Sequence, residues 1–131
     1  ADGLSDRDRG AISVVIVILV IVVLAGAGLI VDGGRVMVAR RHASNIAEGS
    51  ARAAVATATP VSGFRPDVAR AAAMSYATRA GVAPADVVIV VAADHVAVTI
   101  TERRSTVFLI LGGRETITVR ATGIARLAFS P

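Results

Sequence analysis

The longest apolar stretch of the chain runs from Ala11 to Val31 and contains no charged residue. About 20 consecutive apolar residues are enough for a helix to cross a bilayer. Because lipid offers the backbone no hydrogen-bond partner, the valines and isoleucines here are expected to be helical despite their preference for strands in water. The pattern therefore predicts a transmembrane helix over residues 11–31.

Two other interpretations fit this stretch less well. A chain of 131 residues is too short to surround so long an apolar segment with a core of its own. A cleaved secretory signal has an apolar region of about 7–15 residues, and this segment is longer, with no helix-breaking cleavage region after it. We therefore expect the segment to remain in the chain as a membrane anchor.

The apolar stretch ends at Asp32, Gly33, Gly34 and Arg35, where the first charges after it appear. Asp32 and Arg35 are spaced to lie on one side of a helix, where side chains can reach water and lipid head groups. Each glycine costs a helix interior about 1 kcal/mol relative to alanine, so the pair allows a bend or the close approach of a neighbouring backbone. We assign these four residues to the membrane boundary. The alternative, a helix that ends at the glycines, stays open here.

After Arg35 the pattern becomes amphipathic at the helical period, over residues 32–59. One face carries mostly small residues, here named the packing stripe: Val36, Ala39, Ala43, Ile46, Ala47, Ser50, Ala53 and Ala54. The opposite face carries Arg41, His42, Asn45, Glu48 and Arg52, the last two spaced for an i,i+4 ion pair. Small side chains allow a partner to pack closely. The helix should end near Pro60, because the residue before proline resists helical dihedral angles, so one rod from about Ala11 to Thr59 is expected.

Residues 60–131 have the pattern of a small α+β domain. A turn-rich connector leads to a helix from Pro66 to about Ala80, with Gly81 suited to its C-terminal cap. Strands are expected over residues 87–91, 96–103 and 115–128, the first two joined by a turn. Val96, Val98 and Ile100 face inward in the second strand. In the third, Ile117, Val119 and Ala121 share a face, and Gly123 is expected to form a bulge.

Residues 105–113 are apolar and end in two glycines. A short helix capped by Ser105 is the favoured interpretation, with another strand as the alternative. The fold class is then α+β: a long N-terminal helix, a second helix and a small antiparallel sheet of about three strands. The chain divides into a tail or leader (1–10), a transmembrane helix (11–31), its amphipathic continuation (32–59) and the α+β domain (60–131).

Composition argues against several functional classes. The formal charge of +4 is dispersed and aromatic residues make up only 3% of the chain, so neither a nucleic-acid groove nor a base-stacking platform is expected. Cysteine is absent, and His42 and His95 are far apart in sequence, so we expect no metal site and no cofactor. No serine has an evident catalytic partner and the carboxylates are dispersed, so we expect no catalytic residue and no enzyme.

The order of these features resembles a known family. The stretch "DRGAISVVIVILV" followed by "VDGGRVMVARRHASNIAEGSARAAV" is similar to the N-terminus of TadE/TadG-like proteins of tight-adherence (Tad, Flp-type) pilus systems, within the wider type IV pilin-like group. In that family an Arg-Gly step precedes the apolar helix, an Asp-Gly-Arg follows it, and an alanine-rich helix carries an acidic position, here Glu48. The strands and final Ala-Arg pair near the C-terminus are also similar, so the resemblance spans about residues 9–128.

The resemblance implies a single-pass membrane protein with a cytoplasmic N-terminus and an extracytoplasmic α+β domain. It implies a minor pilin or pseudopilin that acts in pilus assembly, and in secretion, by packing. The implied partners are the lipid bilayer and other pilin-like subunits or pilus-assembly membrane proteins, with a homo-oligomer as a further possibility. Prepilin peptidase cuts such proteins after a glycine, which matches Gly10 before Ala11. Pilins of this class carry glutamate at the fifth residue after the cut, whereas this chain has Val15, which favours an uncleaved, TadG-like anchor.

Two alternatives accompany this interpretation. The chain could be the major structural subunit of a pilus filament, or a membrane-anchored binding subunit of a secretion or envelope complex that uses its sheet or the Phe108–Leu111 patch. The orientation has competing signals as well. Arg7 and Arg9 precede the span, whereas Arg35, Arg40 and Arg41 follow it, and this count favours a cytoplasmic C-terminal domain. We rank the family resemblance above the count.

Overall fold

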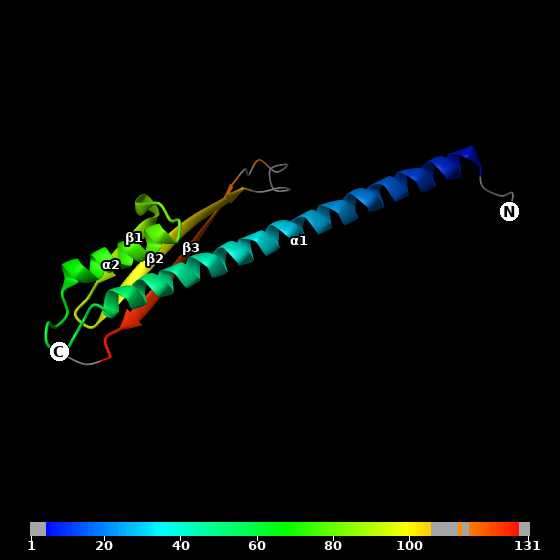
Figure 1. Cartoon of the computed structure of the whole chain (residues 1–131). Helices are drawn as coiled ribbons and strands as arrows, with labels where there is room; N and C mark the ends of the chain where they lie inside the picture. Colours follow the sequence, from blue (N-terminus) through cyan, green and yellow to red (C-terminus); the bar gives the residue numbers. More distant parts are fainter. Residues whose placement is uncertain (1–4, 106–112, 114–115, 129–131) are drawn as a thin grey trace.

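The computed structural model describes residues 5–105, 113 and 116–128. Two helices and three strands follow one another in the order α1 (Asp6–Val55), α2 (Pro66–Arg79), β1 (Val87–Val91), β2 (His95–Ser105) and β3 (Thr116–Arg126), with a short 3-10 turn at Pro84–Asp86 before β1. Figure 1 shows α1 as one long rod whose N-terminal half projects away from the rest of the molecule. The predicted α+β class is confirmed.

Helix α1 begins five residues before the predicted start and ends four before the predicted end. Its early start has a local cause, because the backbone N–H of Asp8 donates to the Ser5 hydroxyl and Asp6 and Asp8 place negative charge in the first turn. At the other end the chain turns at once, and the Thr57 hydroxyl donates to the Ala54 carbonyl at 2.7 Å. Between these ends the helix continues through Gly33 and Gly34, so the alternative that it ends at the glycines was wrong.

The sheet is antiparallel with the order β1-β2-β3, and both pairings keep a regular register. In β2 the side chains of Val96, Val98 and Ile100 are fully buried, as predicted. The bulge expected at Gly123 was wrong, because Gly123 pairs directly with Val98 and its neighbours stay in register. The helix expected over residues 105–113 lies outside the described residues except at its ends, where Ser105 is the last residue of β2 and not a helix cap.

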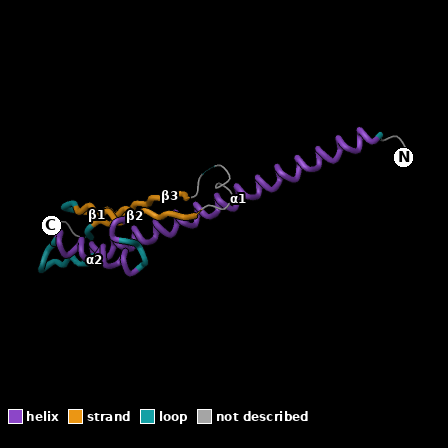
Figure 2. Tube along the Cα trace, turned by 90° about the horizontal axis from the view of Figure 1, so that it is seen from above, coloured by secondary structure: helices purple, strands orange, loops and turns teal. Residues whose placement is uncertain are grey.

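Helices α1 and α2 cover one face of the sheet, and Figure 2 shows the two layers from above. Pro66 opens α2 within its first turn and Gly81 follows its end with a φ of 93°, a value that glycine adopts without strain. The predicted start of α2 is confirmed, and its last residue lies one position before the predicted end. The other face of the sheet leaves Val88, Val90 and Ile124 more than half exposed.

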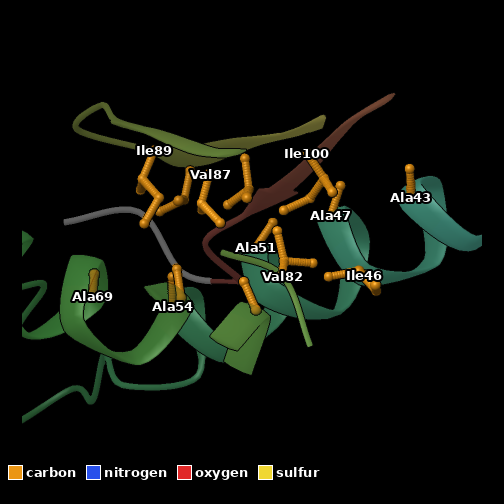
Figure 3. Packing of buried hydrophobic residues seen from close by; sticks show 14 residues of the cluster. Ala43, Ile46, Ala47, Ala51, Ala54, Ala69, Val82, Val87, Ile89 and Ile100 are labelled. Atoms are coloured by element: carbon orange, nitrogen blue, oxygen red, sulfur yellow. The ribbon is translucent and has the colours of Figure 1, made fainter. Parts of the chain in front are cut away.

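The core between the helices and the sheet is built from alanine on the helix side and branched residues on the sheet side. Figure 3 shows Ala47 and Ala51 of α1 beneath β-strand side chains such as Ile100. The buried alanines of the two helices are Ala39, Ala43, Ala47, Ala51, Ala54, Ala69, Ala73 and Ala77. Because alanine adds only a methyl group, the α1 backbone can lie close to the sheet while the valines and isoleucines fill the space.

Ser50 is the exception in this core. Its side chain is fully buried, and among the described residues its hydroxyl has no hydrogen-bond partner. A buried hydroxyl that lost its water without gaining a partner costs about 1–3 kcal/mol. We therefore expect Ser50→Ala to raise the free energy of unfolding by about 1 kcal/mol. Thermal unfolding of the full chain in detergent checks this, with Ser44→Ala as the control, since Ser44 is less buried and its hydroxyl donates to Glu48 at 3.4 Å. An equal or lower melting temperature for Ser50→Ala would contradict the prediction.

Candidate functional site

Residues 11–31 of α1 are apolar and, apart from Gly28, exposed. Helix α1 is long and apolar enough to cross a membrane, by length and composition, and it meets this test alone among the described residues. Its large side chains from Ile12 to Val31 are exposed, with Ile18 at 55% and Ile30 at 77%. Soluble monomeric domains rarely leave such a continuous apolar surface in water, so the exposed surface points to lipid or other apolar helices as its surroundings. At about 1.5 Å per residue, residues 11–31 span about 30 Å, the thickness of a hydrocarbon core.

The four residues assigned to the membrane boundary lie in two different environments. The Asp32 side chain is only 2% exposed and takes part in an interaction within the chain, so it does not face water as the sequence had suggested. The Arg35 guanidinium is exposed and donates to the Ser105 carbonyl of β2 at 3.4 Å. A side chain added at Gly33 or Gly34 would meet open space. Arg35 thus links α1 to the end of β2, whereas the glycines bring no other part of the described chain close.

The packing stripe faces the chain's own domain. Ala39, Ala43, Ala47, Ser50 and Ala54 are fully buried, and Ile46 is 5% exposed. Val36 and Ala53 are half-buried. The contacts are with β3 and β2 over most of the length and with α2 near the end. Ala51, which the sequence pattern left out of the stripe, is also fully buried, because the stripe is widened where α2 joins the sheet.

Gly123 of β3 lies in close contact with the backbone of α1. A Cβ atom added there would lie 2.3 Å from the Glu48 backbone nitrogen and 2.5 Å from the Ala47 carbonyl carbon. Gly49 makes a second close contact, where an added Cβ would lie 2.4 Å from the Tyr76 hydroxyl of α2. The sequence signal was present, since glycine inside a strand often marks a close backbone approach. The sequence analysis predicted a bulge at Gly123, because a bulge and a close backbone approach both favour glycine.

Charged side chains join α1 to β2 beside this contact. The His42 Nδ1 meets the Glu102 carboxylate, whose other oxygen lies 3.3 Å from the Arg104 guanidinium. The Glu102 side chain is 12% exposed, so its carboxylate is partly shielded from solvent, while the His42 side chain lies at the surface and is 51% exposed. Nearby, Arg103 pairs with Asp86 at 2.9 Å. The His42–Glu102 contact joins β2 to α1, and the Arg103–Asp86 pair joins β2 to the 3-10 turn before β1. The predicted Glu48–Arg52 pair on the outer helix face is confirmed, at 3.3 Å.

His95 belongs to a second polar group at the turn between β1 and β2. Its Nδ1 lies 2.7 Å from the Asp94 carboxylate, and Arg126 approaches the same carboxylate at 4.0 Å. The hydrogen bond with His95 lowers the pKa of Asp94 below its ordinary value, with a smaller contribution from Arg126. The turn is exposed and holds no other ionisable group of the described chain in contact. This pairing lies within the exposed turn between β1 and β2.

Chemical machinery is sparse in the described part of the chain. There, no three histidine, aspartate or glutamate side chains gather in a way that could hold a metal ion. The candidate processing position, Gly10 and Ala11, lies exposed inside the first turns of α1, and an added side chain at Gly10 would meet nothing. What the arrangement offers is an apolar helix, a tightly packed domain along its second half, and basic side chains where the two meet.

Comparison with known proteins adds a family assignment for one part of the chain. Residues 10–58, well under half of the chain, match the family model described as "Putative Flp pilus-assembly TadE/G-like". The matched region covers most of α1 and includes the span, the boundary residues and the packing stripe. Neither the curated proteins nor the solved structures gave a match.

Proposed function

We propose that this chain, which is TadE/TadG-like over residues 10–58 and so takes part in the Tad (Flp) pilus system, is a membrane-anchored minor pilin or pseudopilin. It acts by packing and not by chemistry. Residues 11–31 hold it in the membrane as a single span, Asp32 to Arg35 lie at the membrane boundary, and residues 60–131 form its extracytoplasmic domain. Its partners in this proposal are the lipid bilayer and other pilin-like subunits or assembly proteins of the membrane.

The observation that carries the proposal is the division of α1 into two halves of opposite environment. The large apolar side chains from Ile12 to Val31 are exposed, whereas the packing stripe from Ala39 to Ala54 is buried against the chain's own sheet and α2. The apolar first half of such a helix can enter the membrane while the domain packed on its second half stays folded. Because the stripe is already occupied, contacts with another subunit must use the exposed half, the open sheet face or the charged flank of α1.

An uncleaved anchor is the form that we favour. Val15 stands where a processed pilin of this class carries glutamate, and it is 64% exposed on an unbroken helix. Without a carboxylate at this depth, nothing there could neutralise the new amino group of a neighbouring processed subunit. Mass spectrometry of the protein from its native membrane tests this. An N-terminus at Ala11 would reject the anchor form and favour a filament subunit.

The proposed orientation can be tested by cysteine labelling, because the natural chain contains no cysteine. Val61, in the loop between α1 and α2, is 98% exposed. Figure 1 shows this loop at the opposite end of α1 from the apolar N-terminal part. We expect Val61→Cys to react completely with a membrane-impermeant maleimide on intact spheroplasts. The matched control is Asp6→Cys at the start of α1, which should react only after the membrane is permeabilised. Labelling with the opposite pattern would place the domain in the cytoplasm and contradict the proposal.

A further inference from the structure

Beside the membrane boundary, the structure contains a concave pocket of about 550 Å³ between α1 and the end of β2. Its lining comes from Val31, Gly34, Arg35 and Val38 of α1 and from Arg104 and Ser105 of β2. Val31 is the last residue of the apolar span, and Arg35 follows one helical turn later. The pocket therefore lies at the height where the hydrocarbon of a membrane gives way to head groups.

The charges around the pocket favour an anion. Arg35 and Arg104 both reach it, and each makes only one described hydrogen bond, to the Ser105 carbonyl at 3.4 Å and to Glu102 at 3.3 Å. Each guanidinium has five N–H donors, so both keep several for a ligand. The Glu102 carboxylate already contacts His42 and Arg104, and neither it nor Asp32 lines the pocket.

The apolar part of the lining distinguishes a lipid from a free ion. Val31 and Val38 are 47% and 65% exposed, and Gly34 leaves the floor between them open. Arginine binds phosphate oxygens in pairs through its planar fork, while the valines can contact the glycerol and the first methylene groups of an acyl chain. We propose that this pocket binds the phosphate head group of an anionic phospholipid from the surrounding leaflet. The inference rests on the proposed membrane insertion but not on which side the domain lies.

The test uses the full chain, purified in mild detergent and mixed with equal amounts of phosphatidylglycerol and phosphatidylcholine. Native mass spectrometry then counts the lipids that remain bound. We expect the natural chain to retain phosphatidylglycerol preferentially. Arg35→Gln with Arg104→Gln should lower that preference about a hundredfold, because each of the two lost charge-assisted hydrogen bonds corresponds to about tenfold. The Arg35→Lys and Arg104→Lys pair, which keeps the charge but loses the planar fork, should fall between the two.

Arg40→Gln with Arg41→Gln is the matched control, because it removes the same charge from exposed residues of α1 that do not line the pocket. If the control lost as much preference for phosphatidylglycerol, the cause would be the general attraction between basic side chains and anionic lipid, and the proposal would be overturned. An unchanged lipid preference in the Arg35→Gln, Arg104→Gln variant would also overturn the proposal. A cooperative thermal unfolding transition shows that this variant is folded. Displacement of the lipid by inorganic phosphate at millimolar concentration would assign the pocket to free anions instead. Insertion is read separately by extraction with alkaline carbonate, so an inserted chain without lipid preference contradicts this inference alone.

Discussion

Replacing Gly123 with alanine should destabilise the domain by about 3 kcal/mol or more, at the upper end of the usual cost of overpacking. The new Cβ would lie 2.3–2.6 Å from backbone atoms of Ala47 and Glu48. Backbone atoms of a hydrogen-bonded helix cannot rotate away as a side chain can, so α1 and β3 would have to separate along their shared contact. Thermal unfolding of the full chain in detergent, followed by circular dichroism, measures the loss, and Gly123→Val should cost more.

Two other glycines provide controls for this result. Gly33→Ala places the same methyl group in open space on α1 and should leave the domain at least as stable as before. Gly49→Ala meets only the side chain of Tyr76, which is 42% exposed and can move outward, so its cost should be smaller. Because the obstacle at Gly123 is backbone, adding Ala47→Gly should not restore stability. A near-natural melting temperature for Gly123→Ala, or its rescue by Ala47→Gly, would show that the contact is looser than described.

Placing arginine at both Val17 and Ile21 should release the chain from the membrane. These two residues lie one helical turn apart near the centre of the proposed span, and both are exposed, at 57% and 59%. A single arginine at the centre of a membrane helix costs about 2.5–3.5 kcal/mol. The pair should cost more than either alone, and its like charges repel each other because they are neighbours on the helix. We expect alkaline carbonate to extract the double variant from the membrane, whereas the natural chain should remain in the membrane fraction.

The control adds the same two charges outside the span. Met37 and Val61 are 62% and 98% exposed and lie beyond the boundary, so Met37→Arg with Val61→Arg should remain in the membrane fraction. If the central arginines were tolerated as well as these, the exposed apolar surface of α1 would not be in contact with lipid, and the proposed anchor would fail. Release of both variants would instead indicate a general effect of added charge.

The local elements of this protein could be predicted from its sequence because each depends on neighbours along the chain. The apolar segment from Ala11 to Val31, the proline that opens α2 and the alternation of Val96, Val98 and Ile100 all act through spacing within one element. The family resemblance could be recognised for the same reason, because the matched residues 10–58 form one continuous stretch. Bounds were less accurate, because the Ser5 cap extends α1 further than its apolar pattern indicates.

Contacts between elements were decided only by the tertiary structure. Gly123 was predicted to form a bulge because a sequence does not show which backbone approaches a strand. Asp32 was predicted to face water because spacing along the chain does not show that a side chain is buried. The pocket formed by Arg35 and Arg104 joins positions about 70 residues apart, which helical and strand periods cannot relate. The sequence by itself determined that a membrane-compatible helix leads into a small α+β domain. Only the packed structure decided which face of that helix the domain covers and which basic side chains it leaves at the membrane boundary, because these depend on distances through space.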